Sequence, residues 1–520
     1  MSVAITFYDG VGCIGGNKIL MEDGESALFL DFGINFKAEG MFFDEFLGPR
    51  SGFGFYDLLA LDILPPLEGL YRTDLEYPGV WERYSSHPRY RKTEVQGILL
   101  SHAHYGHLSY VREDVPVITN LTAAVICKAL QDTGGGNRLQ EICYINPREY
   151  KDGLLQTGHY KSTAFKQRRY KILGKDFIPE SACTFWENYD HSRKLECCKL
   201  EAGGSEAKIG DFTVKIWPVD HSIPGASAFG IKTSEGWIIY TGDLRLHGKN
   251  AALTRRFFEE AAKLEPLALI CEGTHPGTKK PVTEGEVAAN CFEVVSKAGG
   301  LVVADFGPRN VERLLSFLEI AGKTGRQLVL TTKDVYLLEA LKAAEEDGVP
   351  DPHADGRIRM YIKPKSRMDK WEAALLERMP IDKTVTAEDI KKDPGSYILC
   401  FSYYDFHAFL DIQPEGGTYI YSSSEAFDEE MLIDHQRVRN WIDYFGFELY
   451  GTLGRDRERS GFHASGHIHG PGIEEMVETI KPKVLIPVHT EEREFFSSFE
   501  GISKVTWPEK GKTIAVRANS

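Results

Sequence analysis

Residues 101–107 read Ser-His-Ala-His-Tyr-Gly-His, which places His102, His104 and His107 within six positions. They follow the apolar run Gln96–Ser101, and such a run predicts a buried strand that leads into a histidine-rich turn. Neutral imidazole nitrogens are preferred zinc ligands, so histidines gathered on one turn can converge on a metal ion. The alternative, polar loop histidines without a ligand role, is disfavoured by their density.

Three further positions place a histidine or an aspartate at the end of a strand-like run. His221 lies in Val219–Gly225, Asp243 ends Ile238–Asp243, and His489 ends Leu485–His489. A single histidine or aspartate at the end of a strand more often has a structural role than a ligand role. Together with the histidine turn, they predict a metal centre assembled from distant parts of the chain.

The order of these residues resembles the metallo-β-lactamase superfamily, an α/β class of fold built as a four-layer αβ/βα sandwich. Its first metal motif reads H-x-H-x-D-H, and a distant histidine, an aspartate and a final histidine follow. The resemblance implies two divalent metal ions, with zinc favoured and manganese as the alternative. The implied ligands are His102, His104 and His221 for one ion, and His107, Asp243 and His489 for the other, with Asp243 bridging. Asp31 matches the early aspartate that supports the histidine turn in this family.

Later motifs resemble the β-CASP nuclease subfamily and, within it, the RNase J group. Cys271–His275 is similar to the acidic motif that opens the β-CASP domain, and His463–His467 is similar to the H-x-S-G-H motif. Residues 482–489 resemble the K-P-K…I-P-V-H ending. The resemblance implies that Glu272 orients a ligating or catalytic group and that His467 faces the scissile phosphate. His463, Ser465 and Gly466 would line the phosphate pocket.

A triple serine, Ser422, Ser423 and Ser424, also matches the RNase J group and would contact a terminal phosphate. Serines that cap a helix or close a turn are the alternative interpretation. Nearby aromatic residues can stack on bases, although core packing is expected for at least one of them. These residues are Tyr403, Tyr404 and Phe406.

The chain departs from the family pattern at Gly106, where the H-x-H-x-D-H motif has an aspartate that binds the second metal. Glycine has no side-chain donor. The second site is therefore expected to be weak or empty, unless another carboxylate replaces the ligand or the enzyme is impaired. Asp405 and Asp220 are the carboxylates considered as replacements, but the sequence does not place either of them there.

The chain has 520 residues, which predicts more than one domain. From about residue 246, helix and strand patterns alternate, which favours a parallel sheet. We expect a metallo-β-lactamase core from residues 1–245 and 440–520, with a β-CASP domain inserted at residues 246–439. Two irregular segments, at about 37–94 and 158–200, have no function that the sequence assigns.

Composition favours a cytoplasmic protein. The hydrophobic fraction is 42% and the charged fraction 26%, typical of globular chains. No basic leader or long apolar run indicates a signal peptide or a membrane-spanning helix. Nine scattered cysteines do not form a disulfide pattern. The net charge of −15 disfavours indiscriminate nucleic-acid binding but allows a local basic channel.

The resemblance implies a metal-dependent phosphodiester hydrolase that acts on single-stranded RNA, with DNA as an open alternative. The expected reaction is 5′→3′ exonucleolytic, with endonucleolytic cleavage as a second mode, through in-line attack of metal-bound hydroxide. Relatives commonly form homodimers, so a homodimer is expected. Two alternatives remain: a hydrolase of a small ester or phosphodiester on the same scaffold, and a catalytically weakened RNA- or protein-binding subunit.

Overall fold

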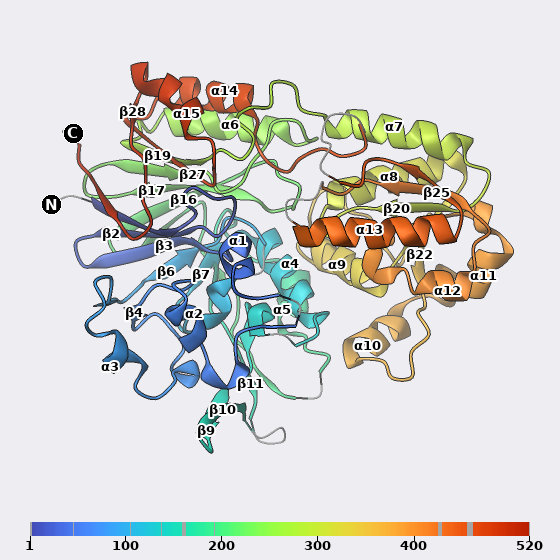
Figure 1. Cartoon of the computed structure of the whole chain (residues 1–520), viewed down its shortest axis with the longest axis horizontal. Helices are drawn as coiled ribbons and strands as arrows, with labels where there is room; N and C mark the ends of the chain where they lie inside the picture. The colour runs from blue at the N-terminus through green and yellow to red at the C-terminus, as the bar shows by residue number, and fades with distance from the viewer. Residues whose placement is uncertain are drawn as a thin grey trace.

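The computed structural model describes residues 3–44, 46–103, 106–136, 138–158, 163–191, 193–424, 429–454 and 461–518. Two lobes lie side by side in Figure 1, one built around two stacked sheets and the other around a third sheet. Within the described residues, none of the helices has both the length and the apolar character needed to cross a membrane.

The first lobe contains two large sheets whose inner faces pack together. The eight-stranded sheet has the order β14-β12-β7-β6-β3-β2-β1-β29, and the seven-stranded sheet has the order β15-β16-β17-β18-β19-β27-β28. The strands of the first sheet are β1 (Val3–Asp9), β2 (Lys18–Asp23), β3 (Ser26–Phe32), β6 (Gly97–Leu99), β7 (Val117–Thr119), β12 (Tyr170–Ile172), β14 (Glu201–Ala202) and β29 (Thr513–Val516). Those of the second are β15 (Glu206–Ile209), β16 (Phe212–Pro218), β17 (Ser227–Lys232), β18 (Trp237–Tyr240), β19 (Ala268–Glu272), β27 (Val484–Val488) and β28 (Lys504–Val505).

Alternation along the strands separates an inner from an outer apolar layer. In β3, Leu28 and Leu30 join the core between the two sheets, whereas Phe29 joins the outer core. The left-handed backbone of Asp31 (φ 54°) interrupts this alternation, so Phe32 also faces the outer core. Side chains on a regular strand alternate between faces, so Asp31 acts as a bulge that breaks the alternation at the end of β3.

Helices cover both outer faces of the paired sheets. α2 (Tyr56–Ala60) and α3 (Val80–Tyr84), which follow the short α1 (Phe36–Gly40), lie below the sheets in Figure 1, and α4 (Leu121–Asp132) packs in the same outer core as Phe29. α6 (Ala251–Ala262) and α14 (Gly470–Ile480) lie above them, with Phe257 and Met476 in a shared apolar cluster. These layers form the predicted αβ/βα sandwich, and the predicted fold class is confirmed.

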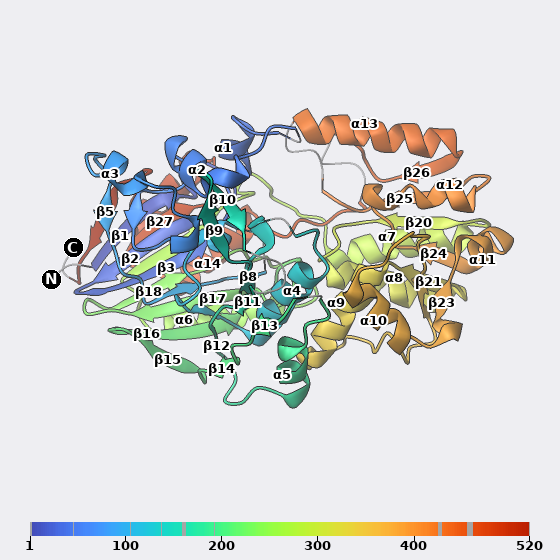
Figure 2. The same ribbon diagram turned by 90° about the horizontal axis from the view of Figure 1, so that it is seen from below.

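The second lobe is a parallel sheet with helices on both faces. Its strand order is β23-β22-β21-β24-β20-β25-β26. The strands are β20 (Val302–Asp305), β21 (Gln327–Leu330), β22 (Ile358–Tyr361), β23 (Thr384–Val385), β24 (Tyr397–Leu399), β25 (Gly417–Tyr421) and β26 (Phe447–Tyr450). The helices are α7 (Glu284–Lys297), α8 (Val311–Thr324), α9 (Thr332–Ala343), α10 (Lys370–Arg378), α11 (Ala387–Lys392), α12 (Ala408–Ile412) and α13 (Glu429–Tyr444). Figure 2 shows α9 and α13 on opposite sides of this sheet.

The chain passes between the lobes more than once. β19 follows residue 245, yet it pairs with β18 and β27 in the second sheet of the first lobe. The third sheet therefore begins only at β20. The return from the second lobe places β27, which precedes His489, beside β19, which ends at Glu272. This pairing brings two distant motifs to the same sheet edge.

Candidate metal centre

Asp31 fixes the start of the histidine turn. Its carboxylate accepts hydrogen bonds from the backbone N–H of Ser101 (2.9 Å) and from the Ser101 hydroxyl (2.7 Å). The Tyr240 hydroxyl donates to the same carboxylate at 2.6 Å. Buried carboxylates need such partners. The left-handed turn at Asp31 thus has a structural reason: it aims the carboxylate at the loop that carries His102.

Asp243 lies between histidines from three parts of the chain. Ligand atoms of His102, His221 and Asp243 all lie within 4.8 Å of one another, and so do those of Asp243, His467 and His489. Asp243 Oδ2 is 3.7 Å from His102 Nε2, and Asp243 Oδ1 is 3.8 Å from His489 Nε2. One carboxylate therefore joins two adjacent groups of potential metal ligands.

The ring nitrogens of three of these histidines have distinct partners. Nδ1 of His102 lies 2.9 Å from Ser101 Oγ. Nδ1 of His221 lies 2.6 Å from the Gly466 carbonyl oxygen, and Nδ1 of His489 lies 2.9 Å from Thr274 Oγ1. An outer partner on one nitrogen fixes the ring and leaves the other nitrogen for a metal. This arrangement is the one expected of ligating histidines.

His467 differs from these three in its contacts. Its Nδ1 lies 3.1 Å from Glu272 Oε2 and 3.9 Å from Asp243 Oδ2, so this nitrogen faces two carboxylates. Burial alone would lower the pKa of His467, but Glu272 and Asp243 outweigh it and raise the pKa to about 9. The Nε2 atom stands on the opposite side of the ring, where it can serve another role.

Glu272 is itself fully buried and tied to both motifs. Its carboxylate accepts from the backbone N–H of Leu244 and from the Thr274 hydroxyl, both at 2.7 Å. Leu244 follows Asp243, and Thr274 contacts His489. Glu272 therefore contacts His467 directly and is linked to Asp243 through Leu244 and to His489 through Thr274.

The electrostatics of the cluster favour a charged Asp243 carboxylate and a neutral His221 ring. Burial would raise the pKa of Asp243, but the surrounding histidines hold it below its ordinary value. Burial lowers the pKa of His221 to about 4, and the nearby His467 adds to this effect. A carboxylate that stays ionised and an imidazole that stays neutral are the forms that bind divalent metals.

His107 belongs to neither of these two groups of potential ligands. Its Nε2 lies 2.5 Å from Glu39 Oε1, on α1. Burial and the charge of the buried Lys18 together lower the pKa of His107 to about 4, although Glu39 opposes them. Gly106 has an extended backbone (φ −164°) and bridges Gly33. The structure thus brings four of the six predicted ligands together, turns His107 to Glu39, and does not describe His104.

The carboxylates considered as replacements for the missing aspartate lie elsewhere. Asp220 pairs with Arg245, with 3.3 Å between its Oδ1 and the guanidinium Nε. Asp405 accepts from the Ser402 hydroxyl at 3.0 Å in the second lobe. Glu39, which sequence reasoning missed, is the carboxylate that reaches His107. No signal in the sequence marked it, because it lies in the irregular insertion.

The residues of the H-x-S-G-H motif lie along one side of the cluster. His463 Nδ1 is 3.4 Å from the Ser422 carbonyl, and Ser465 Oγ accepts from the backbone N–H of His467 at 3.2 Å. A Cβ atom on Gly466 would stand 2.9 Å from His221 Cε1. Glycine is therefore required there for its carbonyl to reach His221.

The triple serine divides into one buried and two half-buried residues. The Ser422 hydroxyl is bonded to the Arg313 guanidinium and to the Phe462 carbonyl. The Ser424 carbonyl accepts from the Tyr421 hydroxyl at 2.7 Å, and the Ser423 side chain is half-buried. Ser422 thus serves the packing between motifs, which leaves Ser423 and Ser424 as the more accessible hydroxyls.

A buried ion-pair network beside the site was not predicted. Arg245 contacts Asp220, Glu284 (3.0 Å) and Glu312 (2.6 Å), and it donates to the Ser465 carbonyl at 3.1 Å. Glu284 also pairs with Arg313 at 2.8 Å. Scattered charged residues carry no local sequence signal for such a network. It joins α7 and α8 of the second lobe to the H-x-S-G-H loop.

The fold and this cluster resemble those of metallo-hydrolases of the metallo-β-lactamase type, and three comparisons point to the same class. Residues 459–497 match the family described as Zn-dependent metallo-hydrolase RNA specificity domain. A crystal structure of a protein of unknown function from Enterococcus faecalis V583 has a TM-score of 0.65 and 22% sequence identity. The match covers 99% of this chain and 100% of that one, and it shows the fold alone.

The curated relatives that the chain matches include ribonucleases J from several bacteria. Ribonuclease J 2 of Streptococcus pyogenes is 24% identical over 332 residues, covering 62% of this chain and 55% of the relative. Ribonuclease J of Helicobacter pylori is 22% identical over 494 residues, covering 94% of this chain and 56% of the relative. The chain thus spans about half the length of these relatives. The chain is RNase J-like, and the predicted resemblance to the metallo-β-lactamase and β-CASP families is confirmed.

Proposed function

We propose that this protein is a metal-dependent ribonuclease that degrades single-stranded RNA from the 5′ end, with internal cleavage as a second mode. One observation carries the proposal. The RNA specificity domain delivers His467 to the same carboxylate, Asp243, that joins His102, His221 and His489. A potential proton donor and a set of metal ligands thus meet at one point.

The donor set fits divalent metal ions. Imidazole Nε2 atoms and one shared carboxylate suit zinc, and manganese is the alternative. We propose that His102 and His221 hold one ion with Asp243, and that His489 and Asp243 hold the other. His104 and His107 remain predicted ligands. The second ion would be held more weakly, because Gly106 offers no donor and His107 contacts Glu39.

When bound, the ions would lower the pKa of a water molecule and neutralise charge on the phosphate. Hydrolysis breaks the bond from phosphorus to the leaving oxygen, and that oxygen must gain a proton. His467 is suited to this step because Glu272 holds its Nδ1 and favours the protonated ring. Its Nε2 would donate the proton. His463, Ser465, Ser423 and Ser424 would contact the phosphates of the strand.

Metal content per chain tests the paired sites directly. We expect elemental analysis to show saturation near two ions after metal is added, and His489→Ala to saturate near one. His407→Ala makes the same change at an exposed position and should match the wild type. Saturation of the wild type at one ion, unchanged by His489→Ala, would contradict the second site.

His467→Gln separates proton donation from metal binding. An amide cannot donate a proton as an acid, so we expect kcat on 5′-monophosphorylated RNA to fall by about 10²- to 10⁴-fold. Metal content should stay at the wild-type value, because Nδ1 of His467 is engaged by Glu272. A loss of one ion from this variant would instead make His467 a ligand.

End-labelled RNA distinguishes the modes of cleavage. Release of 5′-labelled mononucleotides supports 5′→3′ digestion, and internal fragments from a 5′-blocked strand support endonucleolytic cleavage. A DNA strand of the same sequence tests substrate preference. The expected homodimer stays a prediction, which light scattering on the same preparation can check.

One observation favours a second candidate function, a weakened RNA-binding subunit. Gly106 supplies no ligand, and the contact of His107 with Glu39 occupies its Nε2. Such a subunit would bind single-stranded RNA but would neither take up two ions nor cleave the strand when metal is supplied.

A further inference from the structure

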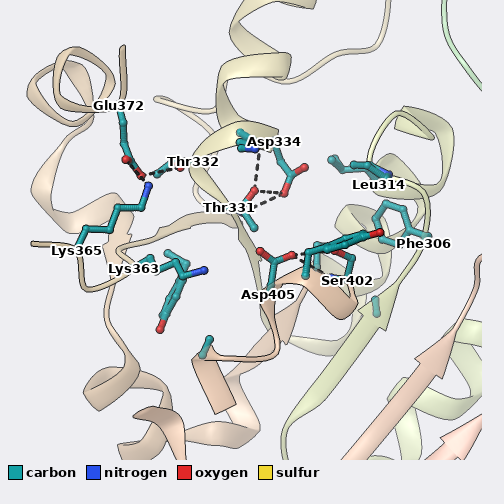
Figure 3. A pocket seen from close by; sticks show the side chains of 17 residues that line it. Phe306, Leu314, Thr331, Thr332, Asp334, Lys363, Lys365, Glu372, Ser402 and Asp405 are labelled. Carbon is teal, nitrogen blue, oxygen red and sulfur yellow. Dashed lines mark hydrogen bonds and ion pairs between the residues drawn. The ribbon is translucent and has the colours of Figure 1, made fainter. Parts of the chain in front are cut away.

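A cavity of about 440 Å³ lies in the second lobe, at the carboxyl ends of β20, β21, β22 and β24. This volume is within the range of small-molecule sites, roughly 300–1,000 Å³. Its walls include Phe306 after β20, Asp334 after β21, Lys363 after β22 and Asp405 after β24 (Figure 3). The metal cluster shares none of these residues.

The topology of the sheet explains why a cavity forms there. β20 and β24 are neighbours, but the chain leaves them toward opposite faces. α8 follows β20 and packs on one face, whereas α12 follows β24 and packs on the other. Crevices at such switch points, beyond the carboxyl ends of parallel strands, are the usual ligand sites of doubly wound sheets.

Two carboxylates present unused oxygens to this cavity. Asp334 Oδ2 accepts from the Thr331 hydroxyl at 2.7 Å, and Asp405 Oδ2 accepts from the Ser402 hydroxyl at 3.0 Å. Among the residues that the structure describes, Oδ1 of each has no hydrogen-bond donor, and Figure 3 shows the same. Burial and the charge of Asp405 raise the pKa of Asp334 to about 7. A ligand with N–H donors would satisfy the two unused oxygens and stabilise the ionised form of Asp334.

Cations stand beside the carboxylates. Lys365 is engaged by Glu372 at 2.6 Å, but Lys333 and Lys363 form no salt bridge within the described part of the chain. Both lysines act electrostatically on Asp405. Two available ammonium groups disfavour a metal ion at the carboxylates and favour a ligand that carries an anionic group next to its N–H donors.

Aromatic side chains complete the lining. Phe306 forms one wall and stacks on Phe317, with 5.5 Å between ring centroids. Tyr404 also lines the cavity and is 79% exposed. Flat aromatic surfaces beside hydrogen-bonding groups suit a planar heterocycle. A free amino acid such as arginine has the required charges but would leave much of this cavity unfilled.

We infer that this cavity binds a guanine mononucleotide, with the base on Asp334 and Asp405 and the phosphate on Lys333 and Lys363. Guanine is the base whose adjacent N1–H and N2–H₂ groups can donate to two carboxylate oxygens at once, here the unused Oδ1 of Asp334 and that of Asp405. Adenine, cytosine and uracil lack that adjacent donor pair. The inference does not depend on the proposed nuclease activity.

Calorimetric titration of the full chain with GMP tests the site. We expect GMP to bind and Asp405→Asn to weaken its binding by at least about 10-fold. Lys363→Ala should weaken GMP but not guanosine, which lacks the phosphate. Asp382→Asn, an exposed change in the same lobe, should match the wild type. Thermal unfolding of Asp405→Asn checks that the turn capped by Ser402 stays intact.

Several results would overturn the assignment. These are no GMP binding at millimolar concentration, equal binding of AMP or arginine, and GMP binding that both Asp405→Asn and Lys363→Ala leave unchanged. Binding of a guanine-containing RNA strand without binding of GMP would also overturn it, since the site would then belong to the strand.

Discussion

Asp243→Asn is expected to remove most of the hydrolytic activity and most of the bound metal together. Asp243 is the one carboxylate that both ligand groups share, and an amide carries no charge to balance a divalent ion. Metal ions contribute several kcal/mol of transition-state stabilisation, and each ~1.4 kcal/mol is a tenfold change in rate. We therefore expect kcat/KM on single-stranded RNA to fall by about 10³-fold or more.

The measurement pairs RNA cleavage with elemental analysis on the same preparation. Asp382→Asn is the matched control, because it makes the same chemical change at an exposed position in the second lobe. Full metal content in Asp243→Asn with normal cleavage would show that the cluster around Asp243 is not the active site. Circular dichroism should confirm that the variant is folded.

Arg245→Met is expected to lower the free energy of unfolding by about 3–5 kcal/mol, far more than the loss of an ion pair at the surface. The Arg245 side chain is fully buried and pairs with Asp220, Glu284 and Glu312. Methionine fills a similar volume but leaves these carboxylates without their cation. An unpaired buried charge costs far more than an ion pair contributes at the surface.

Arg255→Met provides the contrast. Arg255 lies on α6 and pairs with Glu475 at 2.8 Å, but its side chain is half exposed. Loss of such a pair is expected to change the free energy of unfolding by about 0–1 kcal/mol. Urea denaturation, followed by fluorescence, compares the two variants. Equal stabilities would mean that the Arg245 network contributes no more than a surface pair.

The sequence predicted those parts of the site that follow a regular pattern. His221, Asp243 and His489 each end an apolar strand, and parallel strands bring such ends to one edge. The fold class followed from the order of these motifs, which resembles that of the metallo-β-lactamase superfamily. His107 has the same motif context, but its orientation depends on Glu39, which lies in an insertion without periodicity.

The Arg245 network escaped prediction for a related reason. Its members are separated by dozens of residues, and burial of a charge cannot be read from one chain position. The cavity in the second lobe also depends on how four strands are ordered, and that order exists only after folding. Local patterns specify elements, whereas these features arise between elements.

The order of strands also governs how the chain can acquire its structure during synthesis. β19 is made before the whole third sheet, yet its neighbour β27 is made after it. The other edge of β1, which does not pair with β2, stays open longer still, since its partner β29 spans Thr513–Val516. Until these segments leave the ribosome, apolar strand edges stay unpaired, a state prone to aggregation and slow to resolve. The second lobe can mature first, and the metal cluster must be among the last parts to form.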